Sequence, residues 1–542
     1  MFKNNKKHNQ QSLFESTQWM NKRIREKLEK SWAPIFYEYV FRKIDEEPFS
    51  VLYSDIGRPN FPVNILLSLE YIKHMKDAND LELLDDFYFD YLVNYAVGIR
   101  VLGESNLAER TLYYFRERVY VYCVDHPDGE DLLFGQFIGL LKGFASKAGI
   151  TMAEQRTDTT LFMSNIKKAG RMSLAYDVLA KGIKAIPEDM MTGSLSDVLK
   201  PTFKTDALYR SKGNEWDSKL TVILNLCKET LQILEGIPYK QNSDETRILK
   251  RFISEQTITE PSTGKLASKP NKEISPDSLQ SAYDEDATYR RKGNEGHSGY
   301  ALEISETCGK ENPFQLITDY AVRPNITGDA EILTERIGTI RENTGCTDMY
   351  VDGGFNSPDL NNAAEENSIE IHRTNMSGRE PGKKLPVTEF DIDGSTNTIN
   401  KCPGGHTPVR AWIGNTNSSA HFSHEACSGC ELRGLCYSKQ QKKNCVVHIP
   451  LKSIETGRER DKMKTEQIEN TSKRAGIEGS NSALKRKGQD KLDVCGIIKS
   501  TFVSGFNVTA QNIKRFIKFM QGGYKPKKTL APDIGITVPV FG

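Results

Sequence analysis

Three acidic residues that lie far apart in the chain, Asp158, Asp352 and Glu478, could together hold divalent cations. Both aspartates occur in segments typical of strands, and Gly353 and Gly354 provide a turn directly after the second one. Carboxylate oxygens are ligands that suit Mg²⁺ and Mn²⁺. Two such ions can activate a water or a 3′-hydroxyl for in-line displacement at phosphorus. The three acids therefore indicate phosphoryl transfer, whereas a lone aspartate at a strand end is usually a turn residue.

The segment 471–486 is expected to be a helix that carries the third acid. On it Arg474, Glu478 and Lys485 lie at i, i+4 and i+11, and they project within roughly 60° of one another. One interpretation is a solvated pairing of charges on a helical surface. The other is a metal-binding glutamate with two cations beside it for phosphate. The two upstream aspartates favour the second interpretation.

Five of the ten cysteines gather in one short segment, which predicts a second kind of metal site. One Cys-x2-Cys pair with two further cysteines in reach is typical of a tetrahedral zinc site with thiolate ligands. The predicted zinc ligands are Cys402, Cys427, Cys430 and Cys436. Residues that could substitute for one of them are Cys445, His406, His421 and His424. The alternative is a small subdomain with reduced structural cysteines.

The 542-residue chain has 73 basic and 72 acidic side chains, so it is no general polycation. Binding to nucleic acid must come from local basic patches, which are frequent in the final third of the chain. The longest apolar stretch, 132–141, is too short to span a bilayer. The first residues lack the apolar core of a secretory signal, and the cysteines do not resemble a secreted disulfide framework. These features predict a cytoplasmic protein.

The hydrophobic patterns predict a chain of helices and strands in alternating blocks. Residues 1–145 are expected to be helical. A basic, aromatic-rich helix from about Asn106 could belong to a helix-turn-helix relative or to an all-helical packing domain. Strands are expected at 150–166, as a hairpin within 297–324, and at 346–352, with a helix before the last of them.

Three segments in this order, RTDTTLFMSNI, YVDGGF and KRAGIEGSNSALKR, resemble the catalytic blocks of the insertion-sequence DDE transposases. The family's third block often reads Tyr-x2-Arg-x3-Glu-x6-Lys, and this chain matches it at Arg474, Glu478 and Lys485. Thr471 stands where the tyrosine would be. The Asp-x-Gly-aromatic pattern of the second block is matched at residues 352–355. Segments near both ends, such as GRPNFPVNILLSLEYIKHM and DVCGIIKSTFVSGFNVTAQNIKRFIKFM, are also similar, so the likeness covers most of the chain.

The resemblance implies an α/β fold with a ribonuclease-H-like mixed sheet, in which Asp158, Asp352 and Glu478 form the metal-binding triad. Arg474 and Lys485 would contact phosphate near the cleaved end. The implied organisation is a helical N-terminal DNA-binding domain at 1–145, the first core strand at 146–166, a helical insertion and linker at 167–296, the catalytic core at 297–400, a zinc-knuckle-like insertion at 401–450, and C-terminal core helices with a basic tail at 451–542.

Further charged residues are candidates beside this triad. Asp286 precedes the second core strand, where similar transposases often carry an aspartate. We expect it to order the basic loop at 290–292 more than to bind metal. Asp329 is expected to be an acid at the start of a helix. The residues predicted to contact DNA are Arg474, Lys485, Arg486, Lys487, Arg290 and Arg291.

The predicted function is that of a DNA transposase of an insertion sequence. It would cleave at terminal inverted repeats with Mg²⁺ or Mn²⁺, and would join the 3′ ends to target DNA. Its partners would be double-stranded DNA and further copies of the chain, as a homodimer or larger assembly associated with the nucleoid, with no membrane. The alternatives are a ribonuclease-H-like nuclease without strand transfer, a non-catalytic DNA-binding regulator descended from a transposase, and a helical scaffold with a zinc knuckle.

Overall fold

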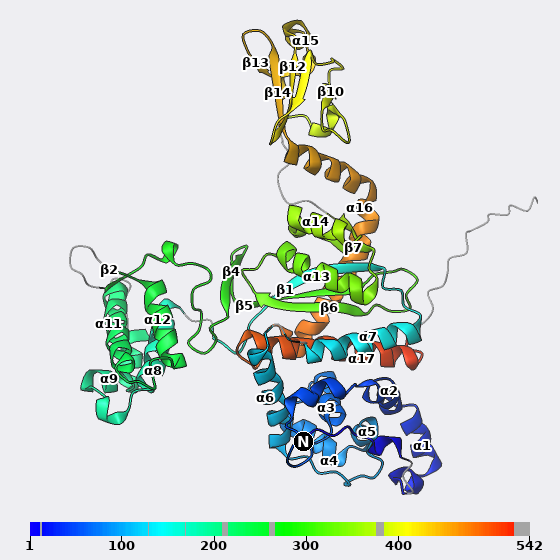
Figure 1. The fold of residues 1–542 in the computed structure, drawn as a ribbon, viewed down its shortest axis with the longest axis vertical. Coiled ribbons are helices and arrows are strands. Elements are labelled where there is room, and N and C mark those ends of the chain that lie inside the picture. Colours follow the sequence, from blue (N-terminus) through cyan, green and yellow to red (C-terminus); the bar gives the residue numbers. More distant parts are fainter. Residues whose placement is uncertain are drawn as a thin grey trace, which may run out of the picture.

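The computed structural model describes residues 1–10, 14–127, 129, 131–167, 170–208, 215–259, 266–374 and 384–524. A central sheet connects three outer parts: the N-terminal helices, a helical insertion, and a long helix α16 (Leu451–Leu484) that carries a small β-rich subdomain at its far end (Figure 1). None of the described helices combines the length and the apolar character needed to traverse a lipid bilayer. The basic tail predicted after residue 524 lies outside the described residues.

The central sheet is mixed. Its strands are β1 (Glu154–Phe162), β4 (Thr288–Lys292), β5 (Glu295–Thr307), β6 (Ile317–Pro324), β7 (Asp348–Val351) and β8 (Glu370–Arg373). β5 pairs antiparallel with both β1 and β6, while β7 runs parallel to β1 and to β8. β4 forms a hairpin with the first part of β5. The resulting order, β6-β5-β1-β7-β8, is compatible with the predicted ribonuclease-H-like core.

Helices cover both faces of this sheet. They are α7 (Leu132–Ala148), α13 (Asp329–Thr344), α14 (Pro358–Glu366) and α17 (Ile497–Met520). Successive residues of a strand face opposite sides. Leu302 and Ile304 of β5 accordingly join the core formed with α7 and α17, whereas Ala301 packs against Ile332 of α13. α13, α14 and β7 share a further apolar cluster on that second face.

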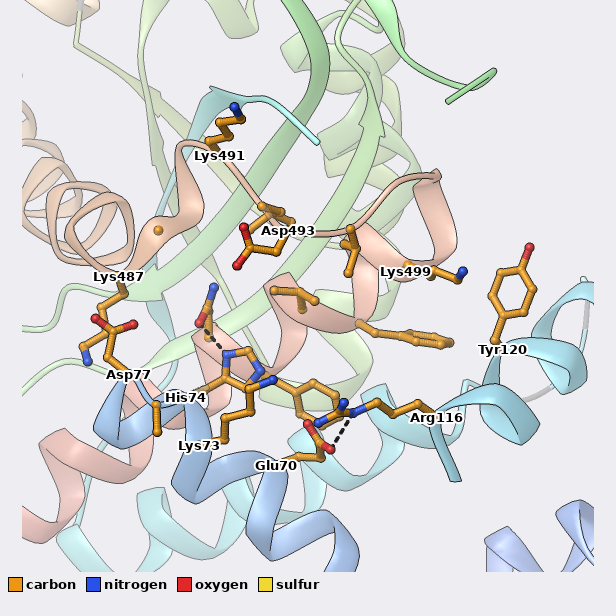
Figure 2. A pocket seen from close by; sticks show the side chains of 18 of the residues that line it. Glu70, Lys73, His74, Asp77, Arg116, Tyr120, Lys487, Lys491, Asp493 and Lys499 are labelled. Carbon is orange, nitrogen blue, oxygen red and sulfur yellow. Dashed lines mark hydrogen bonds and ion pairs between the residues drawn. The ribbon is translucent and has the colours of Figure 1, made fainter. Parts of the chain in front are cut away.

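The N-terminal helices share one apolar core with α7 and α17. They are α1 (Lys22–Glu29), α2 (Trp32–Tyr39), α3 (Val63–Lys76), α4 (Asp80–Phe89), α5 (Tyr91–Ala96) and α6 (Glu109–Asp125). The N-terminus of α4 is fixed by a capping box between Asn79 and Glu82. A cavity of about 610 Å³ lies between α3, α6 and the segment 487–507 (Figure 2). On its wall His74 Nδ1 lies 2.8 Å from Asn507 Oδ1, which joins α3 directly to α17.

The helical insertion connects β1 to the hairpin of β4 and β5. It contains α8 (Arg171–Ile183), α9 (Gly193–Val198), α10 (Pro201–Leu208), α11 (Trp216–Glu235), α12 (Asp244–Gln256), and the short strands β2 (Thr257–Thr259) and β3 (Leu266–Ser268). These helices enclose an apolar core of their own, with Leu224, Cys227 and Leu249 fully buried. The insertion therefore packs as a unit beside the sheet (Figure 1).

The outer end of α16 carries the β-rich subdomain. Its elements are β9 (Asp391–Ile392), β10 (Ile399–Lys401), β11 (Arg410–Ile413), β12 (Asn417–Phe422), α15 (His424–Ser428), β13 (Lys439–Gln440) and β14 (Cys445–Pro450). β14 ends where α16 begins, so the subdomain leads directly into the helix. At the inner end, α16 passes into a short π-helical turn at Lys485–Gln489, and Gly488 there has a φ of +79°, which favours glycine.

Candidate active site

Strand register brings the two predicted aspartates to neighbouring positions. β1 and β7 run parallel, with Glu154 opposite Asp348 and Arg156 opposite Tyr350. Two residues further along each strand, this register sets Asp158 beside Asp352, which directly follows β7. The Asp352 carboxylate also caps the turn after the strand, because its Oδ1 accepts a hydrogen bond of 2.7 Å from the Gly354 amide.

Helix α16 carries Glu478, the third predicted acid, and also Arg474, which lies close to all three carboxylates. The guanidinium Nη2 lies 3.4 Å from Asp158 Oδ1 and 3.5 Å from Asp352 Oδ2. Its Nη1 lies 3.6 Å from Glu478 Oε1. Three carboxylates from a strand, a loop and a helix thus surround a single positive charge. Residues separated by more than 300 positions meet here.

The three acids differ in their exposure to solvent. The side chains of Asp158, Asp352 and Glu478 are 18%, 34% and 68% exposed. Burial raises the pKa of Asp158 above its ordinary value; Arg474 opposes this rise and Asp352 adds to it. The acids of the site therefore range from the mostly buried Asp158 on the sheet to the mostly exposed Glu478 on α16.

Asn481 is a member of this site that the sequence reasoning missed. Its Nδ2 donates a hydrogen bond of 3.0 Å to Asp158 Oδ2. Its Oδ1 is buried and has no hydrogen-bond partner within the described part of the chain. Asn481 lies three residues after Glu478, on the same face of the helix, so the helical spacing could have revealed it.

A cleft of about 570 Å³ opens beside Asp158, Glu478 and Asn481. Cationic side chains on its wall are Lys292, Lys485 and Arg486. Two of these, Lys485 and Arg486, were predicted to contact DNA, and Lys292 belongs to the basic loop expected near the site. The cleft is therefore lined by both acidic and basic side chains.

Other predicted DNA contacts lie away from this cleft wall. Lys487 lines the cavity against α3 and α6 (Figure 2), where its Nζ lies 3.3 Å from the Met75 carbonyl oxygen. Arg290 on β4 forms an ion pair of 3.0 Å with Asp329. Arg291 is an exposed residue of the same strand.

The two acids that were considered beside the triad have separate surroundings. Asp286 Oδ2 accepts a hydrogen bond of 3.1 Å from the Ile497 amide, so it caps α17. Asp329 begins α13, as expected, and its carboxylate lies close to the loop of Asp352: a Cβ added at Gly354 would lie 3.7 Å from Asp329 Oδ2.

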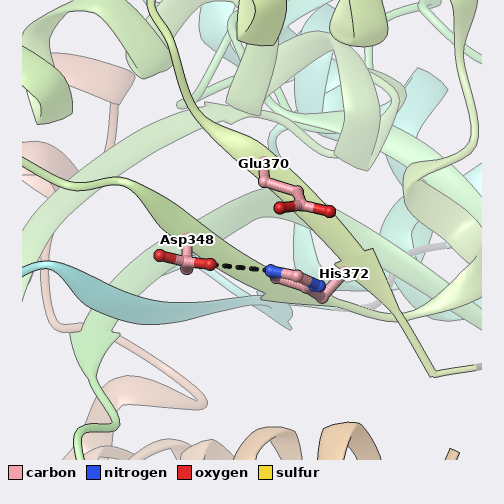
Figure 3. A group of neighbouring side chains, drawn as sticks. All are labelled: Asp348, Glu370 and His372. Carbon is pink, nitrogen blue, oxygen red and sulfur yellow. Dashed lines mark hydrogen bonds and ion pairs between the residues drawn. The ribbon is translucent and has the colours of Figure 1, made fainter. Parts of the chain in front are cut away.

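A different group of side chains has the closest spacing of metal-ligand atoms. Among the described residues, ligand atoms of Asp348, Glu370 and His372 all lie within 4.8 Å of one another, a spacing that the three predicted acids do not reach (Figure 3). This group lies at the start of β7, four residues or about 13 Å along the strand from Asp352. His372 Nε2 lies 2.9 Å from Asp348 Oδ1, and the Tyr350 ring stacks on the imidazole at 4.7 Å.

The chemistry of the two groups distinguishes them. Burial would favour a protonated Asp348, but hydrogen bonds from His372 and Thr347 hold the pKa of this carboxyl below its ordinary value. The Asp348 carboxylate is thus already engaged by hydrogen-bond partners beside it. At the predicted site, by contrast, three carboxylates and the unpartnered amide oxygen of Asn481 are all hard oxygen ligands beside an open cleft. This donor set fits Mg²⁺ or Mn²⁺.

The β-rich subdomain gathers the predicted zinc ligands. Cys402, Cys427, Cys430, Cys436 and His406 line one small cavity. A Cβ added at Gly404 would lie 3.2 Å from Cys430 Sγ and 3.8 Å from Cys402 Sγ, so the turn at this glycine packs directly on two of the sulfurs. Four thiols from a turn, the short helix α15 and the segment after it therefore share one pocket, a donor set that fits zinc.

The thiols of this pocket influence one another. Burial and the neighbouring thiols of Cys445, Cys436 and Cys402 raise the pKa of Cys427 to about 12. Cys445 also lies 3.9 Å from His424 Nδ1, which keeps both residues beside the four predicted ligands. Because its pKa is raised, the Cys427 thiol keeps its proton at neutral pH unless a cation binds it.

Comparison with known families identifies the last part of the chain. A family model described as a transposase DDE domain matches residues 401–517. The matched region contains the cysteine pocket, all of α16 with Arg474, Glu478 and Asn481, and most of α17. Searches among curated proteins and among solved structures gave no match. This match supports the predicted resemblance to DDE transposases over residues 401–517.

Proposed function

We propose that the chain is a DDE transposase that cleaves DNA at the ends of an insertion sequence and joins the exposed 3′ ends to target DNA, a proposal supported by the family match at residues 401–517. The observation that carries this proposal is the meeting of Asp158, Asp352 and Glu478 around one guanidinium, at 3.4 to 3.6 Å. These acids come from the three segments that resemble the catalytic blocks of the family.

We assign the binding of Mg²⁺ or Mn²⁺ to the three acids, with the Asn481 amide oxygen beside them. When bound, a pair of such ions would make a water or a 3′-hydroxyl more nucleophilic and would stabilise the leaving oxygen at phosphorus. Asp158 lies on β1 and Asp352 directly follows the adjoining strand β7, so the paired strands hold both in place. Arg474 offsets part of the charge of the acids, and Asn481 orients the Asp158 carboxylate through its hydrogen bond.

The cations of the cleft provide the contacts to DNA in this proposal. Lys292, Lys485 and Arg486 line the cleft, and such side chains bind phosphate oxygens without reading sequence. For the terminal repeats we propose the N-terminal helices. The exposed face of α6 carries Tyr113 and Tyr114, with side chains 45% and 50% exposed. The transposase is proposed to act as a homodimer or larger assembly on paired DNA ends.

We also propose that the cysteine pocket binds zinc as a structural ion. The four thiols at 402, 427, 430 and 436 would release their protons and bind the ion as thiolates. In the described residues of this subdomain the apolar core is small, with Phe422, Val447 and Ile449 at its centre. Small units of this kind commonly depend on a bound metal for their stability.

Cleavage and joining of a duplex that carries an element end tests the proposed function. We expect the wild-type protein to nick this duplex with Mg²⁺ or Mn²⁺ and to yield joined products with target DNA. Asp158→Asn, Asp352→Asn and Glu478→Gln should each abolish both steps, while binding of the same duplex in a gel-shift assay remains.

His372→Ala is the matched control for the second group of metal-ligand atoms. It removes the imidazole of the cluster at the start of β7 and should leave the metal dependence of cleavage unchanged. Loss of cleavage in His372→Ala, together with full activity in Asp158→Asn, would assign the catalytic ions to the other group. Nicking without joined products would instead indicate a nuclease.

A further inference from the structure

Glu478 is the least constrained of the three acids. Its side chain is 68% exposed, and among the described residues its ion-pair partner is Arg474 of the same helix, at 3.6 Å. Among the described residues, no side chain of the sheet forms a hydrogen bond or an ion pair with this carboxylate. Its place beside Asp158 therefore depends on how the backbone of α16 is docked.

A buried ionic network lies directly beneath this part of α16. Glu306 of β5 is only 1% exposed, and strand pairing sets it opposite Arg156, two residues before Asp158. The Glu306 carboxylate accepts hydrogen bonds from Arg156 Nε at 3.1 Å and from Arg515 Nη1 of α17 at 2.9 Å. The Ser480 hydroxyl of α16 donates to the same carboxylate.

The network is hydrogen-bonded to α16 at one residue before Glu478 and at one residue after it. Arg156 Nη1 donates a hydrogen bond of 2.7 Å to the Lys473 carbonyl oxygen. Arg515 Nη2 donates one of 2.6 Å to the Ser480 hydroxyl. Positions 473 and 480 are seven residues, or two helical turns, apart. Glu478 lies between the two anchors and Asn481 directly after the second, so the docked backbone brings both side chains to the cleft.

Gly476 allows the close approach that these contacts require. A Cβ added at this position would lie 2.5 Å from Arg156 Cζ. The guanidinium cannot withdraw freely, since it is bonded to Glu306 and to the Lys473 carbonyl. Gly479, one turn further along, has no atom within 4 Å of an added Cβ. A methyl group would therefore collide with Arg156 at position 476 but would meet no neighbouring atom at position 479 of the same helix.

We infer that Glu306, clamped between Arg156 and Arg515, is a positioning residue that fixes the register of α16 on the sheet and so places Glu478 and Asn481 beside Asp158. This inference rests on the proposed function, because it concerns how the proposed metal-binding acids are brought together. It adds residues outside the triad, on β1, β5 and α17, that act through the helix.

The test compares Gly476→Ala with Gly479→Ala in the full-length protein. Alanine favours a helix over glycine at either position, so a loss specific to position 476 reports the contact with Arg156. The first readout is hydrogen–deuterium exchange of the backbone amides at 473–484. The second is cleavage of the end-containing duplex as Mg²⁺ is titrated, with duplex binding measured separately.

We expect Gly476→Ala to raise amide exchange in this segment about tenfold or more, and to require about tenfold more Mg²⁺ for half-maximal cleavage. Gly479→Ala should match the wild type in both. Ser480→Ala, which removes one anchor without adding bulk, should give a smaller change in the same direction. Duplex binding without metal should be equal in all variants, because the cleft cations are untouched.

Equal exchange and equal Mg²⁺ dependence in the two glycine variants would overturn the inference while the wild type still cleaves. A wild-type protein that does not cleave would overturn the proposed function, and the catalytic role of the clamp with it. In that case faster exchange in Gly476→Ala would still show that the contact docks the helix, so the two failures are distinguishable.

Discussion

Replacement of Glu306 by glutamine should be among the most destabilising single-atom changes in the protein. The amide has nearly the same shape as the carboxylate, but it removes the negative charge between Arg156 and Arg515. The side chains of these arginines are only 10% and 20% exposed. Both would then be left without an anion in a largely buried position.

The expected cost follows from this loss of one ionic partner. Removal of one member of a buried ion pair typically destabilises a protein by about 3–5 kcal/mol. Arg156 keeps its bond to the Lys473 carbonyl, and Arg515 keeps one of 3.0 Å to the Gln315 carbonyl. Because these bonds remain, we expect a loss of about 3 kcal/mol in the free energy of unfolding at neutral pH, the lower end of that range.

Urea denaturation measures this difference from the shift in midpoint at an unchanged slope. Glu311→Gln is the matched control: it makes the same chemical change at an exposed carboxylate five residues away. Its effect should stay within about 0.5 kcal/mol. A Glu306→Gln protein as stable as the control would refute the reasoning that the two arginines need this anion.

The pH dependence gives an independent check on the same residue. Burial alone would raise the pKa of Glu306, but Arg515 and Arg156 hold this pKa below its ordinary value. A lowered carboxyl pKa contributes stability above the unfolded value of about 4.3, and this contribution is lost as the pH falls through the folded pKa. The difference in the free energy of unfolding between wild type and Glu306→Gln should therefore become smaller below about pH 4. A difference that does not change with pH would contradict a lowered pKa of Glu306.

Three further outcomes are expected. Asn481→Ala should slow cleavage about tenfold to a hundredfold, since a hydrogen bond to a carboxylate is worth about 1.5–3 kcal/mol; single-turnover kinetics measures this, and an unchanged rate would remove Asn481 from the site. Cys427→Ser should abolish zinc binding in metal analysis of the purified protein, whereas Cys123→Ser on α6 should retain it. Lys485→Ala should lower the slope of log affinity for DNA against log salt by about one, and Lys200→Ala in the helical insertion should leave that slope unchanged.

The sequence contained local patterns that identify the main elements of the candidate site. Asp158 and Asp352 stand in strand-like segments, and the spacing of Arg474, Glu478 and Lys485 fits one helical face. The structure has β1, β7 and α16 at these places. Asn481 belongs to the same helical periodicity, so it could have been included from spacing alone.

The residues beneath the helix could not be predicted in this way. Glu306 is the last but one residue of β5, and it lies on the strand face that is otherwise apolar at Tyr300, Leu302 and Ile304. Its partner Arg515 lies 209 positions further along the chain. No periodic pattern relates two residues on different elements at such a distance. Only the packing of β5 against α16 and α17 reveals that this acid is buried and paired.

The length of α16 has a geometric consequence for how DNA could lie on the protein. From Leu451 at the outer end to Glu478, the helix is about 40 Å long when followed along its bent axis at 1.5 Å per residue (Figure 1). One turn of B-form duplex measures about 34–36 Å. A duplex that entered the cleft and followed this helix would therefore meet the cysteine-bearing subdomain within about one helical turn of the phosphate under attack, so this subdomain would contact DNA at a set distance from the scissile position.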